Sequence, residues 1–300
     1  MNGNQVEQIP KDTALRNTDK ANLTSNELPG TNTLLMGPSG NGKTNCLQTL
    51  IECGITPFIL SLEPGIGEVL GHIPADKLHW KYIVGASAGW DDLIRAAELV
   101  NTLSFESLTR MTDPNKGMYG QFIDVLKTLS NFVCDRDGKS YGMIDNWGTD
   151  RALVIDSLSG LNIMSMNLTV GIKPVKAPGE WQVAQDNIQK IIYKLCMQTR
   201  CHFILTAHVE RELNPVTGET KVMVSTIGKA LAPVLPRFFS DVIYLIREGS
   251  NFRWSNMAGG VDTKTRNLPF SDKLEPSFVP LIQKWKSKGG VIKPSFNQQK

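Results

Sequence analysis

The chain lacks any apolar run approaching the roughly 18 residues that a membrane-spanning helix needs, so we expect no membrane partner. It also lacks a repeat of fixed period, which argues against a solenoid. The first residues are polar and contain no apolar core segment, so they indicate a flexible leader rather than a signal peptide. Together these absences predict a cytoplasmic globular protein.

Cysteine pairing and a strong charge of one sign are missing as well. The five cysteines are odd in number and show neither C-x-x-C spacing nor a nearby histidine pair, so we expect reduced core thiols at Cys46, Cys53, Cys134, Cys196 and Cys201. The net charge of +3 is too small to indicate nucleic-acid binding by itself. Any contact with a polyanion must therefore come from local patches.

What the sequence does contain is an alternation of strand and helix patterns. Short apolar runs predict strands at 33–36, 58–62, 80–84, 152–155, 202–206 and 242–246. Apolar residues at helical spacing predict helices at 90–103, 118–133 and 181–195. This alternation predicts an α/β fold whose mainly parallel, doubly wound sheet is covered by helices on both faces.

The domain organisation is predicted from the segments that lack such periodicity. Residues 1–30 are expected to form a flexible leader that ends at the turn pair Pro29-Gly30. One domain spans residues 31–284 and contains a helical insertion at about 101–150, where the turn at 135–138 has no evident role. Residues 285–300 carry four lysines among Gly, Ser, Asn and Gln, which predicts a basic flexible tail.

A glycine-rich motif between the first strand and an expected amphipathic helix has the pattern of a phosphate-binding loop. Its residues are Gly37, Pro38, Ser39, Gly40, Asn41, Gly42, Lys43 and Thr44, hereafter the P-loop. Backbone N–H groups of such a loop bind phosphate, the lysine reaches the β- and γ-phosphates, and the threonine hydroxyl joins the shell of Mg²⁺. The motif predicts ATP and Mg²⁺ as ligands, and a chance glycine turn is the alternative.

Two acidic residues at strand ends complete the expected site. Asp156 ends a continuous apolar run and is the candidate second metal ligand. Many P-loop ATPases place the catalytic glutamate directly after this aspartate, but here that residue is Ser157. Glu63, which follows the strand after the P-loop, is therefore the candidate base that activates water, because the carboxyl ends of parallel strands converge on the ligand. A solvated glutamate before Pro64 is the alternative.

The P-loop, Glu63 and the isolated Asp156 together resemble the RecA-like ATPases. The resemblance extends to Thr206-Ala207-His208, where such proteins place a polar residue that senses the γ-phosphate and couples it to a DNA-binding loop. His208 stands where RecA itself commonly has glutamine, and a strand-end histidine with no such role is the alternative.

A second resemblance concerns a basic segment near the end of the domain. Residues 263–267 are similar to the K-x-R segment of hexameric RecA-type helicases and related phage recombinases, whose basic pair reaches the ATP of a neighbouring subunit. The resemblance implies that Lys264 and Arg266 act in trans, with Arg266 as the finger. A solvated pair on an edge strand is the alternative, and Lys229 and Arg237 are rival fingers.

Over residues 31–270 the chain resembles phage-type AAA/RecA-like ATPases of the single-strand annealing and recombination group. The resemblance implies a homo-oligomer, ring or filament, that acts on single-stranded DNA with recombination or replication partners in the host cytoplasm. Residues 170–180, with Lys173 and Lys176, and 210–225, with Arg211 and Lys221, are the candidate DNA contacts, although the second also has the pattern of an ordinary hairpin.

Other functions share the same motifs. A helicase or packaging motor subunit would need a translocation surface or partner domain that the sequence does not reveal. A small-molecule kinase would need an arginine-rich lid, and the 101–150 insertion has only Arg110 and Arg136. A nucleotide-dependent binding module with little turnover is favoured if Glu63 does not face the phosphates.

Overall fold

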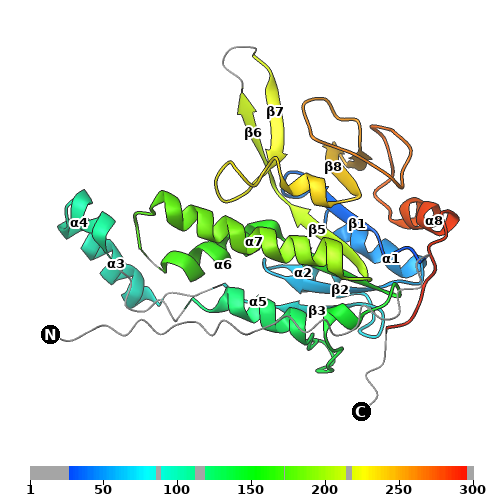
Figure 1. Cartoon of the computed structure of the whole chain (residues 1–300), viewed down its shortest axis with the longest axis horizontal. Helices are drawn as coiled ribbons and strands as arrows, with labels where there is room; N and C mark the ends of the chain where they lie inside the picture. The colour runs from blue at the N-terminus through cyan, green and yellow to red at the C-terminus, as the bar shows by residue number, and fades with distance from the viewer. Residues whose placement is uncertain (1–26, 86–88, 112–118, 172, 214–217, 296–300) are drawn as a thin grey trace, which may run out of the picture.

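A seven-stranded sheet forms the centre of the molecule in the computed structural model, which describes residues 27–85, 89–111, 119–171, 173–213 and 218–295 (Figure 1). The strand order is β3-β2-β4-β5-β1-β8-β9. The strands are β1 (Asn32–Met36), β2 (Thr56–Ser61), β3 (His79–Tyr82), β4 (Arg151–Asp156), β5 (His202–Ala207), β8 (Asp241–Glu248) and β9 (Asn251–Ser255). All neighbours are parallel except β8 and β9, which pair antiparallel.

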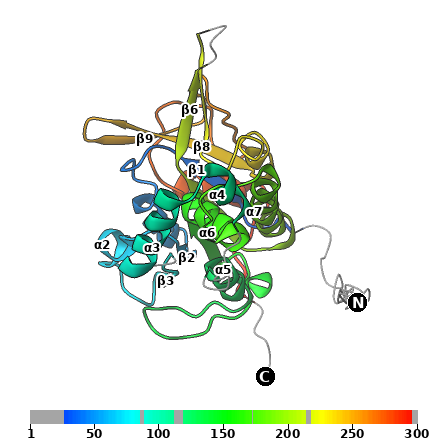
Figure 2. The ribbon, with the colours of Figure 1, turned by 90° about the vertical axis from the view of Figure 1, so that its left-hand side faces the viewer.

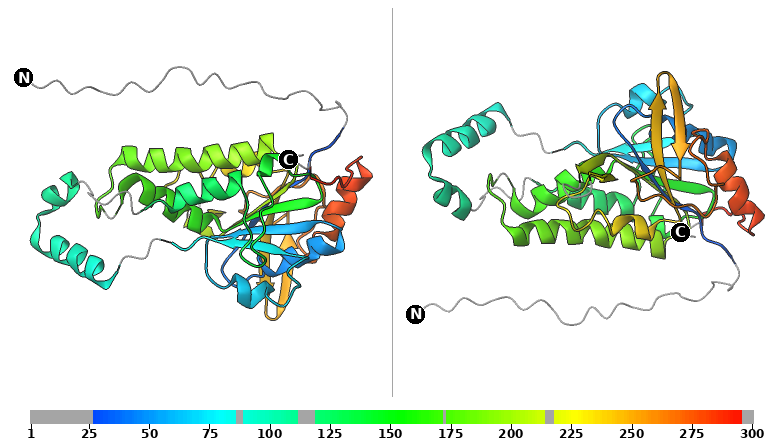
Figure 3. Two further views of the ribbon diagram at one scale, coloured as in Figure 1. Left: turned by 90° about the horizontal axis from the view of Figure 1, so that it is seen from below. Right: turned by 90° about the horizontal axis from the view of Figure 1, so that it is seen from above.

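Helices cover both faces of this sheet. They are α1 (Thr49–Glu52), α2 (Ile66–Leu70), α3 (Trp90–Thr102), α4 (Phe105–Arg110), α5 (Gln121–Ser130), α6 (Leu158–Val170), α7 (Pro178–Gln198) and α8 (Val279–Ser287), with short 3-10 turns η1 (Asn45–Gln48), η3 (Ile144–Asn146) and η4 (Leu235–Phe238). Figure 3 shows α3 and α4 standing apart from the sheet. In the described ranges, no helix combines the length and the apolar character that crossing a bilayer requires.

The two faces of the sheet carry separate cores because side chains alternate along each strand. On β1, Leu34 and Met36 pack in the cluster that includes residues of α5, α6 and α7, while Leu35 packs in the cluster of α1, α2 and α8. The middle residues of the central strands β4 and β5 are apolar and buried because both faces of the sheet are covered. The predicted α/β fold class, with a mainly parallel, doubly wound sheet covered by helices on both faces, is confirmed.

The helical segment after the P-loop is shorter than the expected amphipathic helix. It begins as η1 and continues as the single turn α1. The N–H of Leu47 donates to the carbonyl of Thr44, three residues earlier, which gives the first turn its 3-10 form. Leu47 and Leu50 are buried, as the pattern predicts, and the segment ends at Gly54, whose φ of 78° lies in the left-handed region.

A hairpin outside the main sheet rises from the end of β5. Its strands are β6 (Val209–Leu213) and β7 (Thr220–Val224), and they pair antiparallel. Figures 1 and 2 both show it projecting away from the sheet. The turn expected at 214–218 lies mostly outside the described residues, since 214–217 are not among them.

The predicted flexible tail is wrong for residues 285–295. Trp285, on α8, is buried in the cluster of α1, α2 and α8. Further along, the N–H of Lys293 donates to the Thr149 hydroxyl at 2.8 Å, and the N–H of Asp150 donates to the Lys293 carbonyl at 3.0 Å. The buried indole and these hydrogen bonds hold this segment to the domain. Residues 296–300, and residues 1–26 of the predicted leader, lie outside the described part of the chain.

Candidate nucleotide-binding site

The P-loop, Glu63, Asp156 and His208 lie at or just after the carboxyl ends of four neighbouring parallel strands. Register places Met36 of β1 beside Ala207 of β5, and Ser61 of β2 beside Asp156 of β4. The strand β5, which carries Thr206, lies between the P-loop strand β1 and the Asp156 strand β4. Ligand crevices of open parallel sheets lie at this edge.

The P-loop is seated between β5 and β8. The N–H of Gly37 donates to the Ala207 carbonyl at 3.1 Å, and the Asn41 amide donates to the Leu245 carbonyl at 2.9 Å. Gly40 and Gly42 have φ values of 74° and 80°, which favour glycine. Ser39 and Gly40 are exposed at the tip of the loop, so its N–H groups are accessible to a ligand there.

The Lys43 side chain folds back onto the first residues of the P-loop. Its ammonium donates to the carbonyls of Gly37 and Pro38, both at 2.7 Å, and the residue is buried. Burial lowers the pKa of Lys43, and the nearby negative charges of Asp156 and Glu63 oppose that shift. The two carboxylates therefore lie within electrostatic range of the ammonium, as a phosphate-binding lysine next to a metal site requires.

Asp156 is hydrogen-bonded through both carboxylate oxygens. The Thr44 hydroxyl donates to Oδ2 at 2.8 Å, and the Thr206 hydroxyl donates to Oδ1 at 2.5 Å. Burial raises the pKa of Asp156, and these two hydrogen bonds lower it. The predicted metal ligands Thr44 and Asp156 thus meet, and hydroxyl and carboxylate oxygens are the donors that Mg²⁺ prefers. The sequence analysis places Thr206 at the end of a strand and assigns it no role.

Glu63 is tied to two residues that the sequence analysis singled out. Ser157 donates its hydroxyl hydrogen bond to Glu63 Oε1, and His208 Nε2 lies 3.5 Å from Glu63 Oε2. The same Ser157 oxygen accepts from the N–H of Ser159 at 3.1 Å and so caps α6. The serine that replaces the usual glutamate after Asp156 therefore contacts the glutamate on the neighbouring strand.

Lys264 and Arg266 lie at the other end of the sheet. Lys264 pairs through its backbone with Val242 near the start of β8, which runs beside the start of β1. Asp241, which is fully buried, accepts a hydrogen bond from the N–H of Arg266 at 2.9 Å. Arg266 is exposed. This basic pair is thus separated from the P-loop of its own chain by the length of the strands.

The rival fingers occupy two further positions. The Lys229 ammonium pairs with Glu212 of β6 at 2.5 Å. Arg237 is exposed on η4, and its carbonyl accepts from the Lys264 ammonium at 3.2 Å. Neither contact involves the P-loop.

Two residues beside the P-loop were missed by sequence reasoning. Arg247, near the end of β8, places a guanidinium nitrogen 4.0 Å from the position that a Cβ at Gly40 would take. Its guanidinium lies 5.5 Å from the centre of the Phe252 ring, and that ring lies 3.5 Å from the corresponding position at Gly42. No signal in the sequence could reveal them, because their proximity depends on β8 being the neighbour of β1.

The first candidate DNA segment connects α6 to α7. Lys173 pairs with Glu180 at 2.9 Å, and the Lys176 ammonium lies 5.6 Å from the centre of the Trp181 ring. Residue 172 is outside the described part of the chain. The ion pair offsets the charge of Lys173, whereas Lys176 keeps its positive charge beside the Trp181 ring.

The second candidate segment is the β6–β7 hairpin. Lys221 pairs with Asp262 at 3.0 Å, while Arg211 is exposed on β6. Glu210 accepts from the Ser225 hydroxyl across the base of the hairpin at 2.5 Å. The exposed part of this hairpin carries charges of both signs.

Comparisons with known proteins give a likeness of fold only. No protein-family model and no curated protein matches the sequence. Among solved structures, the flagellar accessory protein FlaH from Methanocaldococcus jannaschii matches over 76% of this chain and 77% of its own, at 10% identity and a TM-score of 0.33. The RadB recombinase matches over 79% of this chain and 93% of its own, at 14% identity and a TM-score of 0.31. At these values neither identifies a family or an activity for this chain.

Proposed function

We propose that this protein is a Mg²⁺-dependent ATPase. The observation that carries the proposal is the contact of the Thr44 hydroxyl with the buried Asp156 carboxylate at 2.8 Å, beside a P-loop that encloses Lys43. An all-oxygen donor pair next to a phosphate-binding lysine suits a metal-bound triphosphate. When bound, Mg²⁺ would neutralise charge on the phosphates.

The residues of the chain have distinct roles in this proposal. The P-loop N–H groups bind the phosphates, and Lys43 exchanges its carbonyl partners for phosphate oxygens. Asp156 is held in place by Thr44 and Thr206 through its two oxygens. Glu63 accepts the proton of the attacking water, and Ser157 holds the carboxylate toward the site.

The neighbour in a homo-oligomer supplies the remaining positive charge. Arg266 lies beside the start of β8, at the end of the strands opposite its own P-loop, so in this proposal it acts on the ATP of an adjacent subunit, with Lys264 beside it. Asp241 supports this arrangement, since it accepts hydrogen bonds from the N–H groups of Arg266 and Asn267, both at 2.9 Å. These contacts fix the backbone that presents the finger.

Single-stranded DNA is the proposed polymer on which the ATPase acts, in phage recombination, annealing or replication. The projecting β6–β7 hairpin follows directly from β5, whose end carries Thr206 and leads to His208 (Figure 1). His208 contacts Glu63 through its side chain and directly precedes Val209, the first residue of the hairpin. A movement of Glu63 when the phosphates bind or leave can therefore be passed to the hairpin through His208. This proximity supports His208 as the coupling residue.

Measured ATP hydrolysis tests the proposal. Wild-type protein, Lys43→Ala and Arg266→Ala are compared with and without single-stranded DNA, and Arg110→Ala, on the exposed face of α4, serves as an exposed-arginine control. We expect DNA to stimulate the wild type and the control, and both site variants to lose turnover. Mixing Lys43→Ala with Arg266→Ala restores some activity if the finger acts in trans. DNA-independent turnover contradicts the proposed action on single-stranded DNA, and phosphate transfer to a small acceptor contradicts the proposed ATPase.

A nucleotide-dependent binding module with little turnover is the second candidate. One observation favours it: Ser157 contacts one oxygen of Glu63, and His208 lies 3.5 Å from the other. A carboxylate that contacts Ser157 through one oxygen and His208 through the other is a poor acceptor of a proton from water until one of these contacts breaks. Tight ATP binding without a steady-state rate, in the presence of DNA, would support this reading over the ATPase.

A further inference from the structure

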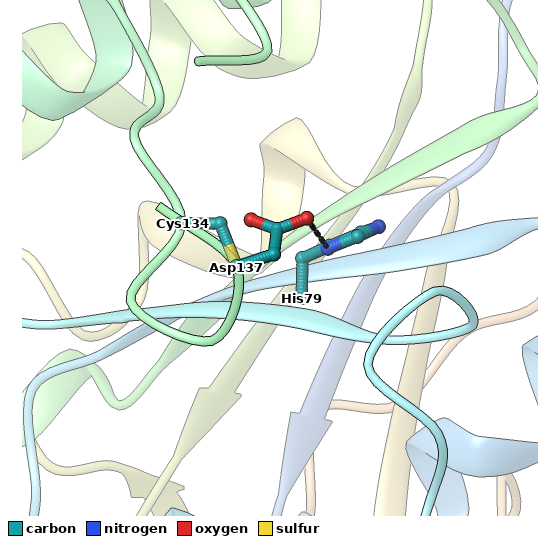
Figure 4. Close-up of side chains that lie close together, drawn as sticks. All are labelled: His79, Cys134 and Asp137. Carbon is teal, nitrogen blue, oxygen red and sulfur yellow. Dashed lines mark ion pairs between the residues drawn. The ribbon is translucent and has the colours of Figure 1, made fainter. Parts of the chain in front are cut away.

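Three metal-ligating side chains from distant parts of the chain meet away from the nucleotide site (Figure 4). His79 begins β3, and Cys134 and Asp137 belong to the turn that follows α5. A ring nitrogen of His79, the Sγ atom of Cys134 and a carboxylate oxygen of Asp137 all lie within 4.8 Å of one another. We propose that these three residues bind a zinc ion.

The turn is held against β3 by the two residues between its ligands. The N–H of Asp135 donates to the Trp80 carbonyl at 2.8 Å, and the Asp135 carboxylate accepts from the N–H of Tyr82 at 2.7 Å. Arg136 donates to the Leu78 carbonyl at 2.7 Å, and its guanidinium lies 4.3 Å from the centre of the Trp80 ring. Asp135 and Arg136 thereby fix the position of Cys134 and Asp137 opposite His79.

His79 gives an independent indication of a ligand. The residue is only 4% exposed, and among the described residues its Nδ1 atom has no hydrogen-bond partner. Asp137 Oδ2 lies 3.7 Å from this Nδ1 atom. A buried polar atom without a partner is costly, and a metal ion on Nδ1 would satisfy it.

The spacing and chemistry of the three donors suit zinc. In tetrahedral zinc sites the bonds are about 2.0–2.3 Å, so ligand atoms lie about 3.3–3.8 Å apart. The 3.7 Å between His79 and Asp137 already falls in that range, and only the longer separations must contract. A thiolate among the donors selects zinc over Mg²⁺ or Ca²⁺, which take oxygen ligands.

Neighbouring groups hold the ligands in place. The N–H of Arg136 donates to Cys134 Sγ at 3.3 Å, which fixes the position of the sulfur. The Tyr141 hydroxyl donates to Asp137 Oδ2 at 2.6 Å and the N–H of Lys139 donates to Oδ1 at 3.0 Å, so the carboxylate is held in place through both oxygens. Hydrogen bonds of this kind orient metal ligands and tune affinity.

The cavity beside the ligands can supply a fourth position. It has a volume of about 470 Å³ and is lined by His79 and Asp137 together with residues at the starts of β2 and β4. Its polar lining and size admit water, so zinc would have three protein ligands and one water. The acidic groups in the lining, Asp76, Asp137 and Asp150, offset the positive charges of Lys139 and Arg151.

Metal titration of the full chain tests this proposal. Protein stripped with a chelator is titrated with Zn²⁺ against a chromophoric competitor. Wild type should bind one Zn²⁺ per chain, and His79→Gln, Cys134→Ser and Asp137→Asn should each bind at least about a hundredfold more weakly. Cys53→Ser, which removes a half-buried thiol elsewhere, is the matched control and should bind as wild type does.

Two further measurements separate zinc binding from a folding defect. Co²⁺ added to wild type and to Cys53→Ser should give a thiolate-to-cobalt charge-transfer band, which Cys134→Ser should lack. Added Zn²⁺ should raise the melting temperature of wild type but not of the ligand variants. A wild type without that band, or zinc binding that survives all three ligand substitutions, overturns the proposal.

Discussion

The hydrogen bond between Thr206 and Asp156 makes a measurable contribution to folding stability. Thr206 is fully buried, and its hydroxyl donates to Asp156 Oδ1 at 2.5 Å. Thr206→Val keeps the shape of the side chain but leaves that oxygen of a buried carboxylate without its donor. Hydrogen bonds to charged groups contribute about 1.5–3 kcal/mol, so we expect the free energy of unfolding at neutral pH to fall by about that amount.

The pH dependence of this loss follows from the pKa of Asp156. Burial already raises that pKa above its value in the unfolded chain, and the Thr206 hydrogen bond opposes the rise. Removing the hydroxyl raises the folded-state pKa further. The added penalty is complete at a pH above the folded-state pKa of Asp156 in the variant. It shrinks as acid protonates this carboxyl group in the folded variant and in the folded wild type.

Thr33 provides a matched control for this substitution. It is fully buried on the neighbouring strand β1, and its hydroxyl has no hydrogen-bond partner among the described residues. Thr33→Val should therefore be neutral or slightly stabilising. Equilibrium urea unfolding at several pH values measures both variants. If Thr206→Val costs no more than Thr33→Val, or if its cost does not change with pH, the account of Asp156 is wrong.

Two other substitutions test how α6 and β2 position the site. Ser157→Ala removes the contact with Glu63, so we expect roughly tenfold slower ATP turnover in steady-state kinetics. It also removes the cap of α6, so we expect a stability loss of about 1 kcal/mol in thermal melting. Gly160→Ala would place a Cβ 2.5 Å from Leu62 Cβ and should cost about 1–3 kcal/mol in urea unfolding, whereas Gly179→Ala, whose Cβ meets nothing within 4 Å, should not.

The parts of the site that sequence predicts are those carried by local patterns. A continuous apolar run that ends in a polar residue marks a buried parallel strand and its carboxyl end, and this pattern located Glu63, Asp156 and His208. The P-loop was found in the same way, from a glycine-rich turn after such a run. The structure brings these residues together at one edge of the sheet, and their catalytic roles remain predictions.

Elements without a local pattern were not predicted. The helix α6 is buried on several sides, and apolar residues such as Leu158, Leu161, Met164 and Met166 give it no single face with a 3.6-residue period. In α8, Leu281, Ile282 and Trp285 do have helical spacing. The predicted boundary between the domain and the tail, at residue 285, separates Trp285 from the other two. Lysines around Trp285 then resemble a solvated tail, although the indole is buried.

Contacts between distant segments are also beyond local reading. Arg247 adjoins the P-loop only because β8 is the neighbour of β1, and strand order is a property of the whole fold. His79 meets Cys134 across 55 residues, a spacing that matches no zinc motif, so the cysteine pattern gave no indication of that site. Both observations depend on tertiary structure.

The central claim is that Glu63 activates water for hydrolysis of ATP bound at the P-loop. Its most direct test compares wild type with Glu63→Gln in two measurements, equilibrium ATP binding and steady-state ATP hydrolysis with Mg²⁺ and single-stranded DNA. Loss of a general base costs about 10²–10⁴-fold in rate, so we expect unchanged ATP binding and a fall in turnover of at least about a hundredfold. Turnover by Glu63→Gln equal to that of wild type would contradict the account.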